Sequence, residues 1–214
     1  MDKTIVRLGA RHAEAATATL AAAFMGDPAM TWLFPDDDVR ERRLPALMRW
    51  TFEDHLRHGM ALGTPGAEAV TLWRPPGVVH EHAPLTPPAM VRFLAMLGTA
   101  VMRAEKLDRT IEQHLPQGEQ QYYLRMAAVR PDRQGQGLGG LTIRAGLAEA
   151  DAAGLPSVLE TATESNVGLY RALGFDVIDA WQVARDGPCF WTMTRPVQAN
   201  AAYINLAPSR TISR

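Results

Sequence analysis

One glycine-rich stretch decides the fold: Val129-Arg130-Pro131-Asp132-Arg133-Gln134-Gly135-Gln136-Gly137-Leu138-Gly139-Gly140. It lies between a predicted strand at 122–129 (YYLRMAAV) and a predicted helix over about 138–153. The backbone N–H groups of such a turn, together with the positive end of the helix dipole, bind anions. Glycines let a pyrophosphate approach the chain closely. The stretch therefore predicts a phosphate-binding turn between a strand and a helix.

The same glycines also match a dinucleotide-binding fingerprint. Gly135, Gly137 and Gly140 satisfy G-x-G-x-x-G, and Glu160 follows twenty residues later on a predicted strand. Against this alternative, the first glycine comes six residues after the apolar strand ends, and too little chain follows for a doubly wound sheet. A P-loop is excluded, because no Gly-Lys-Ser/Thr follows the glycines.

The chain after the glycines alternates strands with short helices. We expect a strand at 156–162 (PSVLETA), a helix at about 165–173, and strands near 175–184 and 188–194. Including the strand before the glycines, the second half of the chain is therefore β-α-β-α-β-β.

The first half mixes helices with antiparallel strands. In order, it predicts a strand at 4–9, helices at 11–25 and 38–58, a hairpin of strands at 60–62 and 67–73, and a helix at about 89–114. The two halves together predict an α/β fold, in detail an α+β mixed sheet flanked by helices. We expect residues 1–196 to form a single domain and residues 197–214 a C-terminal tail.

Composition limits the partners and the compartment. The 214 residues are 47% apolar, enough for a sizeable core, and a formal net charge of -1 disfavours nucleic acid as a partner. The single Cys189 excludes an internal disulfide and fits a reducing compartment. Because the sequence has neither an apolar N-terminal segment nor a run of about 18 apolar residues, we expect no membrane partner and a cytoplasmic location.

Three ordered motifs carry a resemblance to one family. The glycine-rich stretch resembles the pyrophosphate signature Arg/Gln-x-x-Gly-x-Gly/Ala of the Gcn5-related N-acetyltransferases (the GNAT superfamily), with Gln134, Gly137 and Gly139 at its defined positions. Residues 159–162 (LETA) and 166–175 (NVGLYRALGF) resemble the next strand and helix of that family. Within the family, the chain is similar to the branch that includes puromycin N-acetyltransferase.

The resemblance implies a fold and a co-substrate. The GNAT fold has a twisted, mostly antiparallel central sheet that is splayed where acetyl-CoA binds. In the family, the backbone of the strand before the glycines holds the pantetheine arm and the acetyl carbonyl, and the glycine turn holds the pyrophosphate. On this sequence the implied cofactor-binding residues are Ala127, Ala128, Val129, Gln134, Gly135, Gln136, Gly137, Leu138, Gly139, Gly140 and Asn166. Asn166 has an alternative role as a helix cap.

The resemblance also implies one catalytic residue, and the sequence offers a candidate for a second. Tyr170 lies four residues after Asn166 on the same helical face and is the implied general acid toward the sulfur. Many family members carry a glutamate on the strand before the loop, whereas this chain has YYLRM at 122–126. Glu160 on the following strand is therefore the candidate general base, acting through water.

The acceptor site is expected in the first half of the chain. Aromatic walls with one carboxylate suit an ammonium on an apolar body. The candidate substrate-binding residues are Phe24, Asp27, Trp32 and Trp73, with Phe34 close by in the sequence. We expect the acceptor to be a primary amine on a small molecule, of the aminonucleoside-antibiotic type if the branch resemblance holds. The alternatives are a protein or peptide N-acetyltransferase and a non-catalytic acyl-CoA-binding sensor.

Two further features are interpreted as structural or incidental. His80-Glu81-His82 lies in a proline-bordered loop without a further ligand set, so we expect no metal. His114 ends a predicted helix before Pro116 and is interpreted as a structural residue.

We expect the protein to be a monomer or a homodimer.

Overall fold

A seven-stranded sheet runs through the described part of the chain, which in this computed structural model comprises residues 4–77, 86–117 and 120–198. The strand order is β1-β2-β3-β4-β5-β7-β6, and β4 and β5 are the parallel pair in an otherwise antiparallel sheet. This confirms the predicted mixed α/β fold. The strands are β1 (Val6–Arg7), β2 (Met60–Gly63), β3 (Ala69–Arg74), β4 (Tyr122–Val129), β5 (Ser157–Thr161), β6 (Asp176–Gln182) and β7 (Cys189–Arg195).

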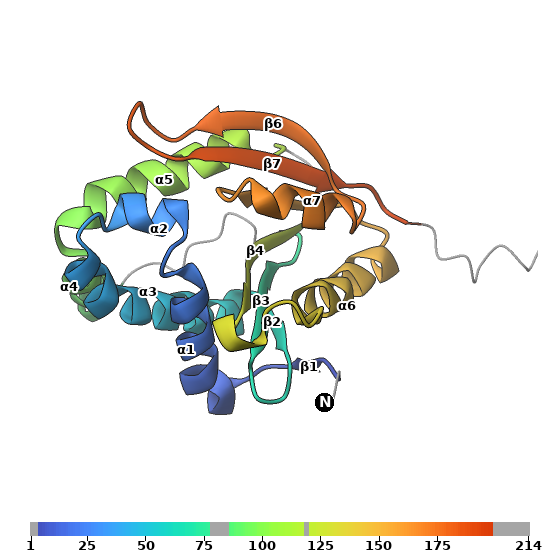
Figure 1. The fold of residues 1–214 in the computed structure, drawn as a ribbon, viewed down its shortest axis with the longest axis horizontal. Helices are drawn as coiled ribbons and strands as arrows, with labels where there is room; N and C mark the ends of the chain where they lie inside the picture. Colours follow the sequence, from blue (N-terminus) through green and yellow to red (C-terminus); the bar gives the residue numbers. More distant parts are fainter. Residues whose placement is uncertain (1–3, 78–85, 118–119, 199–214) are drawn as a thin grey trace, which may run out of the picture.

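Helices cover both faces of the sheet. Figure 1 shows α1 and α3 on one side of the central strands and α6 on the other. The helices are α1 (Ala13–Phe24), α2 (Pro28–Leu33), α3 (Asp37–His58), α4 (Pro87–Leu97), α5 (Val101–His114), α6 (Leu138–Ala152) and α7 (Ser165–Arg171). Short 3-10 turns lie at Ala10–His12, Gly98–Ala100 and Pro131–Arg133.

Two elements of the first half differ from the prediction. The helix expected at 89–114 is two helices, because Gly98 adopts φ 55° and breaks it between α4 and α5. Helix α2, which lies between the helices predicted at 11–25 and 38–58, was not predicted and starts at Asp27-Pro28. The Asp27 carboxylate accepts the N–H groups of Ala29 and Met30, and Pro28 occupies the first turn.

The sheet opens between β4 and β5. Their parallel ladder joins Tyr122 to Ser157 and ends at the pair Leu124 and Leu159. On its other edge β4 stays paired with β3 as far as Val129. The second half of β4 therefore has backbone groups on the β5 side that no strand of the described structure uses, which is the splay that the family resemblance implies.

A β-bulge lies next to this opening. Leu124 pairs with Trp73 and Met126 pairs with Leu72, so Arg125 is one extra residue on β4. A bulge changes the direction of a side chain relative to a regular strand. It places Arg125 on the face where α5 packs, as its ion pair with Asp108 of that helix shows.

Trp73 is a core residue, which corrects the prediction that it contacts the acceptor. Its side chain is 0% exposed and packs on β2, β4 and α6, with Ile143 and Leu147 among its neighbours. The helix comes this close because residue 146 is glycine: a Cβ there would lie 2.2 Å from the Trp73 ring.

Two sequence-based interpretations lie outside the described residues: the tail from residue 199 to 214 and the His80-Glu81-His82 motif. The last described residue, Gln198, donates its backbone N–H to Asp151 at 3.1 Å. Within 4–77, 86–117 and 120–198, no helix is long and apolar enough to cross a membrane.

We expect Gly146→Ala to lower the free energy of unfolding by about 2 kcal/mol, because the overpacking cost exceeds the gain in helix propensity. Chemical denaturation measures the change. The matched control is Gly168→Ala in α7, where no atom lies within 4 Å of the added Cβ and stability should stay the same or rise. Equal effects of the two substitutions would contradict the close packing of Trp73 on α6.

Candidate functional site

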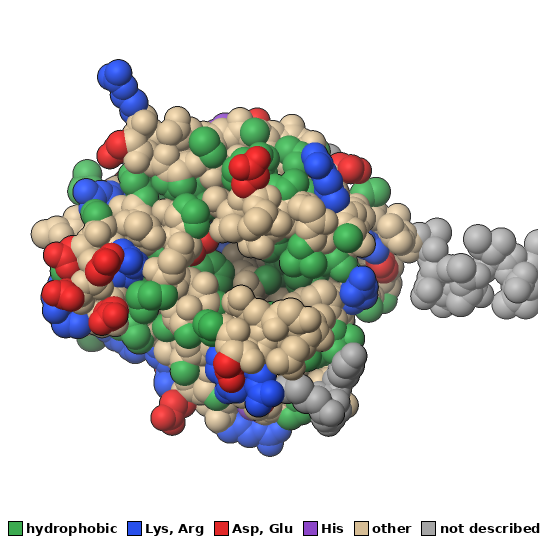
Figure 2. All heavy atoms as spheres, viewed as in Figure 1, with side chains coloured by type: hydrophobic (Ala, Val, Ile, Leu, Met, Phe, Trp, Pro, Cys, Tyr) green, Lys and Arg blue, Asp and Glu red, His purple; other side chains and the backbone are tan. Residues whose placement is uncertain are grey.

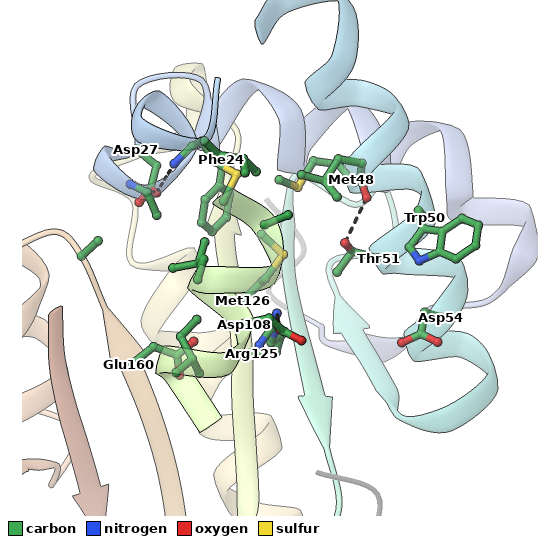
Figure 3. A pocket seen from close by; sticks show the side chains of 18 of the residues that line it. Phe24, Asp27, Met48, Trp50, Thr51, Asp54, Asp108, Arg125, Met126 and Glu160 are labelled. Atoms are coloured by element: carbon green, nitrogen blue, oxygen red, sulfur yellow. Dashed lines mark hydrogen bonds and ion pairs between the residues drawn. The ribbon is translucent and has the colours of Figure 1, made fainter. Parts of the chain in front are cut away.

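A pocket of about 530 Å³ lies over the opening between β4 and β5. Helices α2, α3, α4 and α5 form its outer walls, β4, β5 and α7 form most of the remaining lining, and α1, β3 and β7 contribute one residue each. Figure 2 shows a recess near the centre of this face, at the position of β4 in Figure 1. In Figure 3, Glu160 lies on one side of the pocket and Trp50 with Asp54 on the opposite side, with Arg125 and Asp108 between them.

The structure brings together six of the residues singled out from sequence and separates the others. Trp32 is half-buried and packs beside α5 and β7, and Phe34 is 1% exposed in a separate cluster with α4. Neither is part of the pocket lining, and Trp73 is not either. The predicted residues that do line the pocket are Phe24, Asp27, Ala127, Glu160, Asn166 and Tyr170.

The glycine turn forms an open cradle at the start of α6. Gly135 and Gly137 have φ values of 74° and 77°, and no atom lies within 4 Å of a Cβ built on either residue. The first intrahelical bond runs from Leu141 N–H to the Gly137 carbonyl, so the N–H groups of residues 138–140 have no partner within the helix. This combination of open space, left-handed glycines and free N–H groups fits a diphosphate.

The rest of the turn is tied to β4. The Gln134 side chain donates to the Val129 carbonyl at 3.1 Å, so this predicted cofactor residue holds the turn against the strand. Gly139 also approaches β4 closely, since a Cβ there would lie 3.2 Å from a methyl group of Val129. Gln136, Leu138 and Gly140 belong to the same turn, where Leu138 is buried and Gln136 is exposed. Ala128 points into the core on the α1 side of the sheet.

Glu160 lies on β5 beside the opening. Its Oε1 accepts a hydrogen bond from the Tyr123 hydroxyl at 2.5 Å, and its Oε2 is buried without a partner among the described residues. Burial raises the pKa of Glu160 to about 7, while the positive charge of Arg125 and the Tyr123 hydrogen bond oppose the rise. A carboxyl group with a pKa near neutrality and one free oxygen can take up a proton at physiological pH.

Tyr170 projects from α7 toward the same opening. The ring is 7% exposed and packs edge-on against Phe175, with the ring centroids 6.1 Å apart. Burial, followed by the negative charges of Glu160 and Asp27, raises the pKa of the Tyr170 phenol above its ordinary value of 10. The phenol is therefore protonated at neutral pH and can donate a proton, and it lies close enough to both carboxyls to interact with them.

Asn166 does not cap its helix. Helix α7 begins at Ser165 after Glu164, no side chain caps it, and Asn166 is its second residue. Its side chain lines the pocket one turn before Tyr170. Of the two roles considered for Asn166 from sequence, the cap is therefore wrong.

A second buried proton acceptor in the pocket wall is less suited to catalysis. His55 Nδ1 lies 2.7 Å from the Thr51 carbonyl, and its Nε2 is buried without a partner in the described part of the chain. Burial lowers the pKa of His55 to about 3. The imidazole is thus neutral and a weak base, whereas Glu160 titrates near neutrality.

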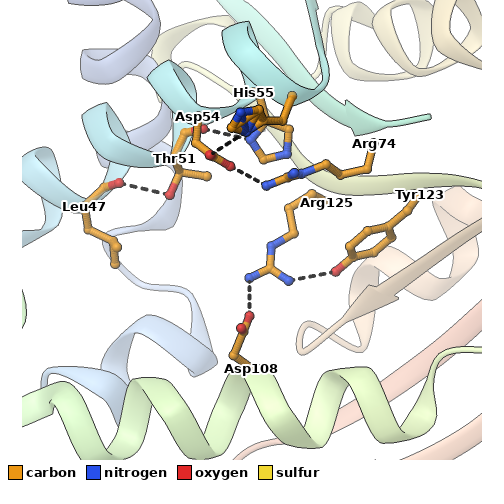
Figure 4. A network of polar contacts seen from close by, with 9 residues as sticks. Leu47, Thr51, Asp54, His55, Arg74, Asp108, Tyr123 and Arg125 are labelled. Atoms are coloured by element: carbon orange, nitrogen blue, oxygen red, sulfur yellow. Dashed lines mark hydrogen bonds and ion pairs between the residues drawn. The ribbon is translucent and has the colours of Figure 1, made fainter. Parts of the chain in front are cut away.

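Sequence reasoning missed a polar network on the floor of the pocket. Arg125 donates to the Tyr123 hydroxyl at 3.1 Å and to Asp108 at 2.9 Å (Figure 4). Arg74 pairs with Asp54 on the neighbouring part of the floor. Arg125 occupies an inward position on a mostly apolar strand, which was the one signal in the sequence. Its partner Asp108 looked like an ordinary helix-surface residue.

Sequence reasoning also missed the aromatic wall. Trp50 on α3 and Phe93 on α4 both line the pocket, with ring centroids 5.7 Å apart. The guanidinium of Arg92 lies 5.6 Å from the Trp50 ring centroid. These residues come from helices far apart in the sequence, so no local pattern joins them.

Comparisons with known proteins agree with this geometry. A model of the acetyltransferase (GNAT) family matches residues 96–175, which include β4, the glycine turn, α6, β5 and α7. A structure titled histone acetyltransferase HPA2 and related acetyltransferase, from Corynebacterium glutamicum, is similar with a TM-score of 0.70 and 20% identity, covering 92% of this chain and 98% of that chain.

Two further solved structures share the fold. Arylalkylamine N-acetyltransferase 2 from Aedes aegypti has a TM-score of 0.58 at 12% identity, covering 91% of this chain and 99% of that chain. The ribosomal-protein-S18-alanine N-acetyltransferase from Escherichia coli has a TM-score of 0.52 at 17% identity, covering 96% and 99%. At these identities the likenesses concern the fold alone.

We expect Glu160→Gln to stabilise the protein in a pH-dependent way. The carboxyl has a higher pKa in the folded chain, about 7 against 4.5, so folding binds protons in that range and wild-type stability falls as pH rises through it. Glutamine mimics the protonated form. The variant should match wild type below this range and exceed it by roughly 3 kcal/mol above it.

Thermal unfolding at about pH 5 and about pH 8 measures the difference. Glu149→Gln on the exposed side of α6 reports the effect of losing a surface carboxylate. A stability difference between Glu160→Gln and wild type that stays constant with pH would show that Glu160 does not titrate in this range.

Proposed function

We propose, from the match of residues 96–175 to a GNAT acetyltransferase family model, that this chain transfers the acetyl group of acetyl-CoA to a primary amine of a small molecule. The family uses acetyl-CoA as its acetyl donor. The observation that carries the acceptor assignment is the pocket of about 530 Å³ over the opening of the sheet. That volume falls in the range of about 300–1,000 Å³ that binds small organic ligands.

The lining of the pocket supports an amphipathic cation as the acceptor. Phe24, Trp50 and Phe93 offer apolar and aromatic surface, which attracts both hydrocarbon and ammonium groups. Asp27 and Glu160 place carboxyl groups at the end of the pocket near Tyr170. An amine on an apolar body would point its nitrogen toward that end.

The donor side is assigned to the glycine turn and the free edge of β4. The N–H groups at the start of α6 would hold the diphosphate, and the unpaired backbone from Ala127 to Val129 would hold the pantetheine arm and polarise the acetyl carbonyl. Asn166 would contact the same arm from α7. Acetyl-CoA supplies an acetyl group activated as a thioester.

The two catalytic roles follow from the protonation states. An ammonium acceptor first loses one proton to solvent, which leaves a neutral amine with a lone pair. Glu160, directly or through a water molecule, then accepts the proton that this neutral amine loses as its nitrogen bonds to the acetyl carbon. Tyr170 donates the proton that the sulfur takes up as the carbon–sulfur bond breaks. The proton held by Glu160 and the one lost by Tyr170 balance, so solvent exchange restores both groups.

A peptide acceptor is the second candidate. It is favoured by the similarity in fold to the ribosomal-protein-S18-alanine N-acetyltransferase. A peptide needs a groove open along its length, whereas here α2, α3, α4 and α5 all contribute walls. We therefore rank the small-molecule amine first. Residues 1–196 would act as one cytoplasmic acetyltransferase domain, as a monomer or a homodimer.

The test is release of free thiol from acetyl-CoA, measured with Ellman's reagent. The panel contains arylalkylamines, aminonucleosides such as puromycin, polyamines and short peptides with free N-termini. Turnover that is confined to compact amines supports the proposal. Turnover that is confined to peptides would replace it with the second candidate, and binding of acetyl-CoA without release on any amine would reject a small-molecule transferase.

We expect Tyr170→Phe to reduce kcat about 100-fold, because it removes the proton donor for the departing thiolate. The dissociation constant of acetyl-CoA, measured by calorimetry, should stay the same. Tyr122→Phe is the matched control, since Tyr122 does not line the pocket. Unchanged kcat in the Tyr170 variant would remove this residue from the chemistry.

We expect Trp50→Ala and Phe93→Ala each to raise the acceptor KM about tenfold, because each loses aromatic surface in the pocket. The acetyl-CoA KM should not change. Ile178→Ala on β6 is the control, because Ile178 is 50% exposed and lies outside the pocket lining. An equal rise in both KM values would place the acceptor elsewhere.

A further inference from the structure

We infer, on the basis of the function proposed above, that Tyr123 and Arg125 are positioning residues for the general base: they fix one oxygen of Glu160, keep the carboxyl ionised and leave its other oxygen to the acceptor amine. No local motif in the sequence contains this arrangement. It arises because the base is on β5 and its supporting residues are on the neighbouring strand.

The hydrogen bonds leave Glu160 with one occupied oxygen and one free oxygen. The Tyr123 hydroxyl donates to Oε1 at 2.5 Å, whereas Oε2 is buried and has no partner among the residues described. The Tyr123 ring is 1% exposed in the core beside Leu107 and Val158, so its hydroxyl is held in a fixed direction. A carboxylate held in this way presents a defined lone pair to an incoming proton.

Arg125 orients the Tyr123 hydroxyl. Its Nη1 donates to the Tyr123 hydroxyl at 3.1 Å, which commits the hydroxyl proton to Glu160. Its Nη2 donates to Asp108 on α5 at 2.9 Å, and its guanidinium carbon lies 5.8 Å from the Tyr123 ring centroid. The bulge in β4 places Arg125 where it can make these contacts. The hydrogen bonds therefore run from Asp108 through Arg125 and Tyr123 to Glu160.

The charged groups around Glu160 come from each element packed against it. Tyr123 and Arg125 lie on β4, Asp108 on α5 and Tyr170 on α7, and Asp27 at the start of α2 faces Tyr170. Arg125 and the Tyr123 hydrogen bond lower the pKa of Glu160, and Asp108 raises it. Removal of the Tyr123 hydroxyl or of the Arg125 charge should therefore raise the pKa of Glu160, and removal of the Asp108 charge should lower it.

The experiment compares the pH profiles of kcat/KM for wild type, Tyr123→Phe and Arg125→Met. The base must be ionised, so activity rises with pH through its pKa. In both variants this rise should move to higher pH by about one unit, the size expected for losing one charge-assisted hydrogen bond. Arg125→Lys, which keeps the charge, should restore part of the shift. Asp108→Asn should move the rise in the opposite direction.

Three controls identify the titrating group. Tyr122→Phe removes the neighbouring phenol on the same strand, whose side chain is outside the pocket, and should leave the profile in place. Glu160→Gln should remove the part of the rise that does not change with the acceptor. Two acceptors whose amines have different pKa values separate the titration of the enzyme from that of the substrate, because only the substrate's titration changes with the acceptor.

The outcomes distinguish this inference from the proposed function. If wild type releases no thiol with any amine, the proposed function fails. If wild type is active and Glu160→Gln loses that part of the rise, but the Tyr123 and Arg125 variants keep the wild-type profile, both residues are merely structural and the inference is overturned. Tyr123→Phe keeps the buried ring. Should this variant fail to fold, Asp108→Asn on the pocket wall tests the inference instead: a rise of kcat/KM that moves to lower pH supports it, and an unmoved rise overturns it.

Discussion

The early end of the β4–β5 ladder is the constraint on which the site depends. The two strands pair from Tyr122 to Leu124 and then separate, while β4 stays paired with β3 as far as Val129. Separation leaves backbone groups of β4 unpaired inside the protein, which is costly unless a ligand or water satisfies them. The same separation lets a pocket formed by helices α2 to α5 reach the face where α7 carries Tyr170.

Opposing electrostatic effects set the behaviour of Glu160. Burial favours its neutral form, whereas Arg125 and the Tyr123 hydrogen bond favour the ionised form, and the balance lies near neutral pH. A buried carboxyl with a raised pKa lowers the stability of the fold at neutral pH. Functional sites commonly cost a protein stability in this way. Arg125 is itself neutralised by Asp108, so the floor of the pocket holds charge without leaving it unpaired.

Local features of the sequence predicted much of the fold. Strand β4 has the bounds read from its apolar run, α3 ends at His58 as predicted, and the glycine turn lies at the start of α6. The errors arose where one local signal has two meanings. Asp27-Pro28 reads as a turn and also as a helix start, and Gly98 can continue a helix or break it. Trp73 looked like a ligand-binding aromatic because its packing partner, Gly146, is far away in the sequence.

The sequence by itself determined the fold class, the glycine turn at the start of α6 and the Tyr170 helix, because each depends on residues within one strand–turn–helix unit. Only the tertiary structure decided the pocket over the sheet opening and the contacts of Glu160. Trp50, Phe93, Asp108, Arg125 and Glu160 come from α3, α4, α5, β4 and β5. Their burial, hydrogen bonds and charges exist only once those elements pack, since a pKa or a cavity is a property of neighbours in space.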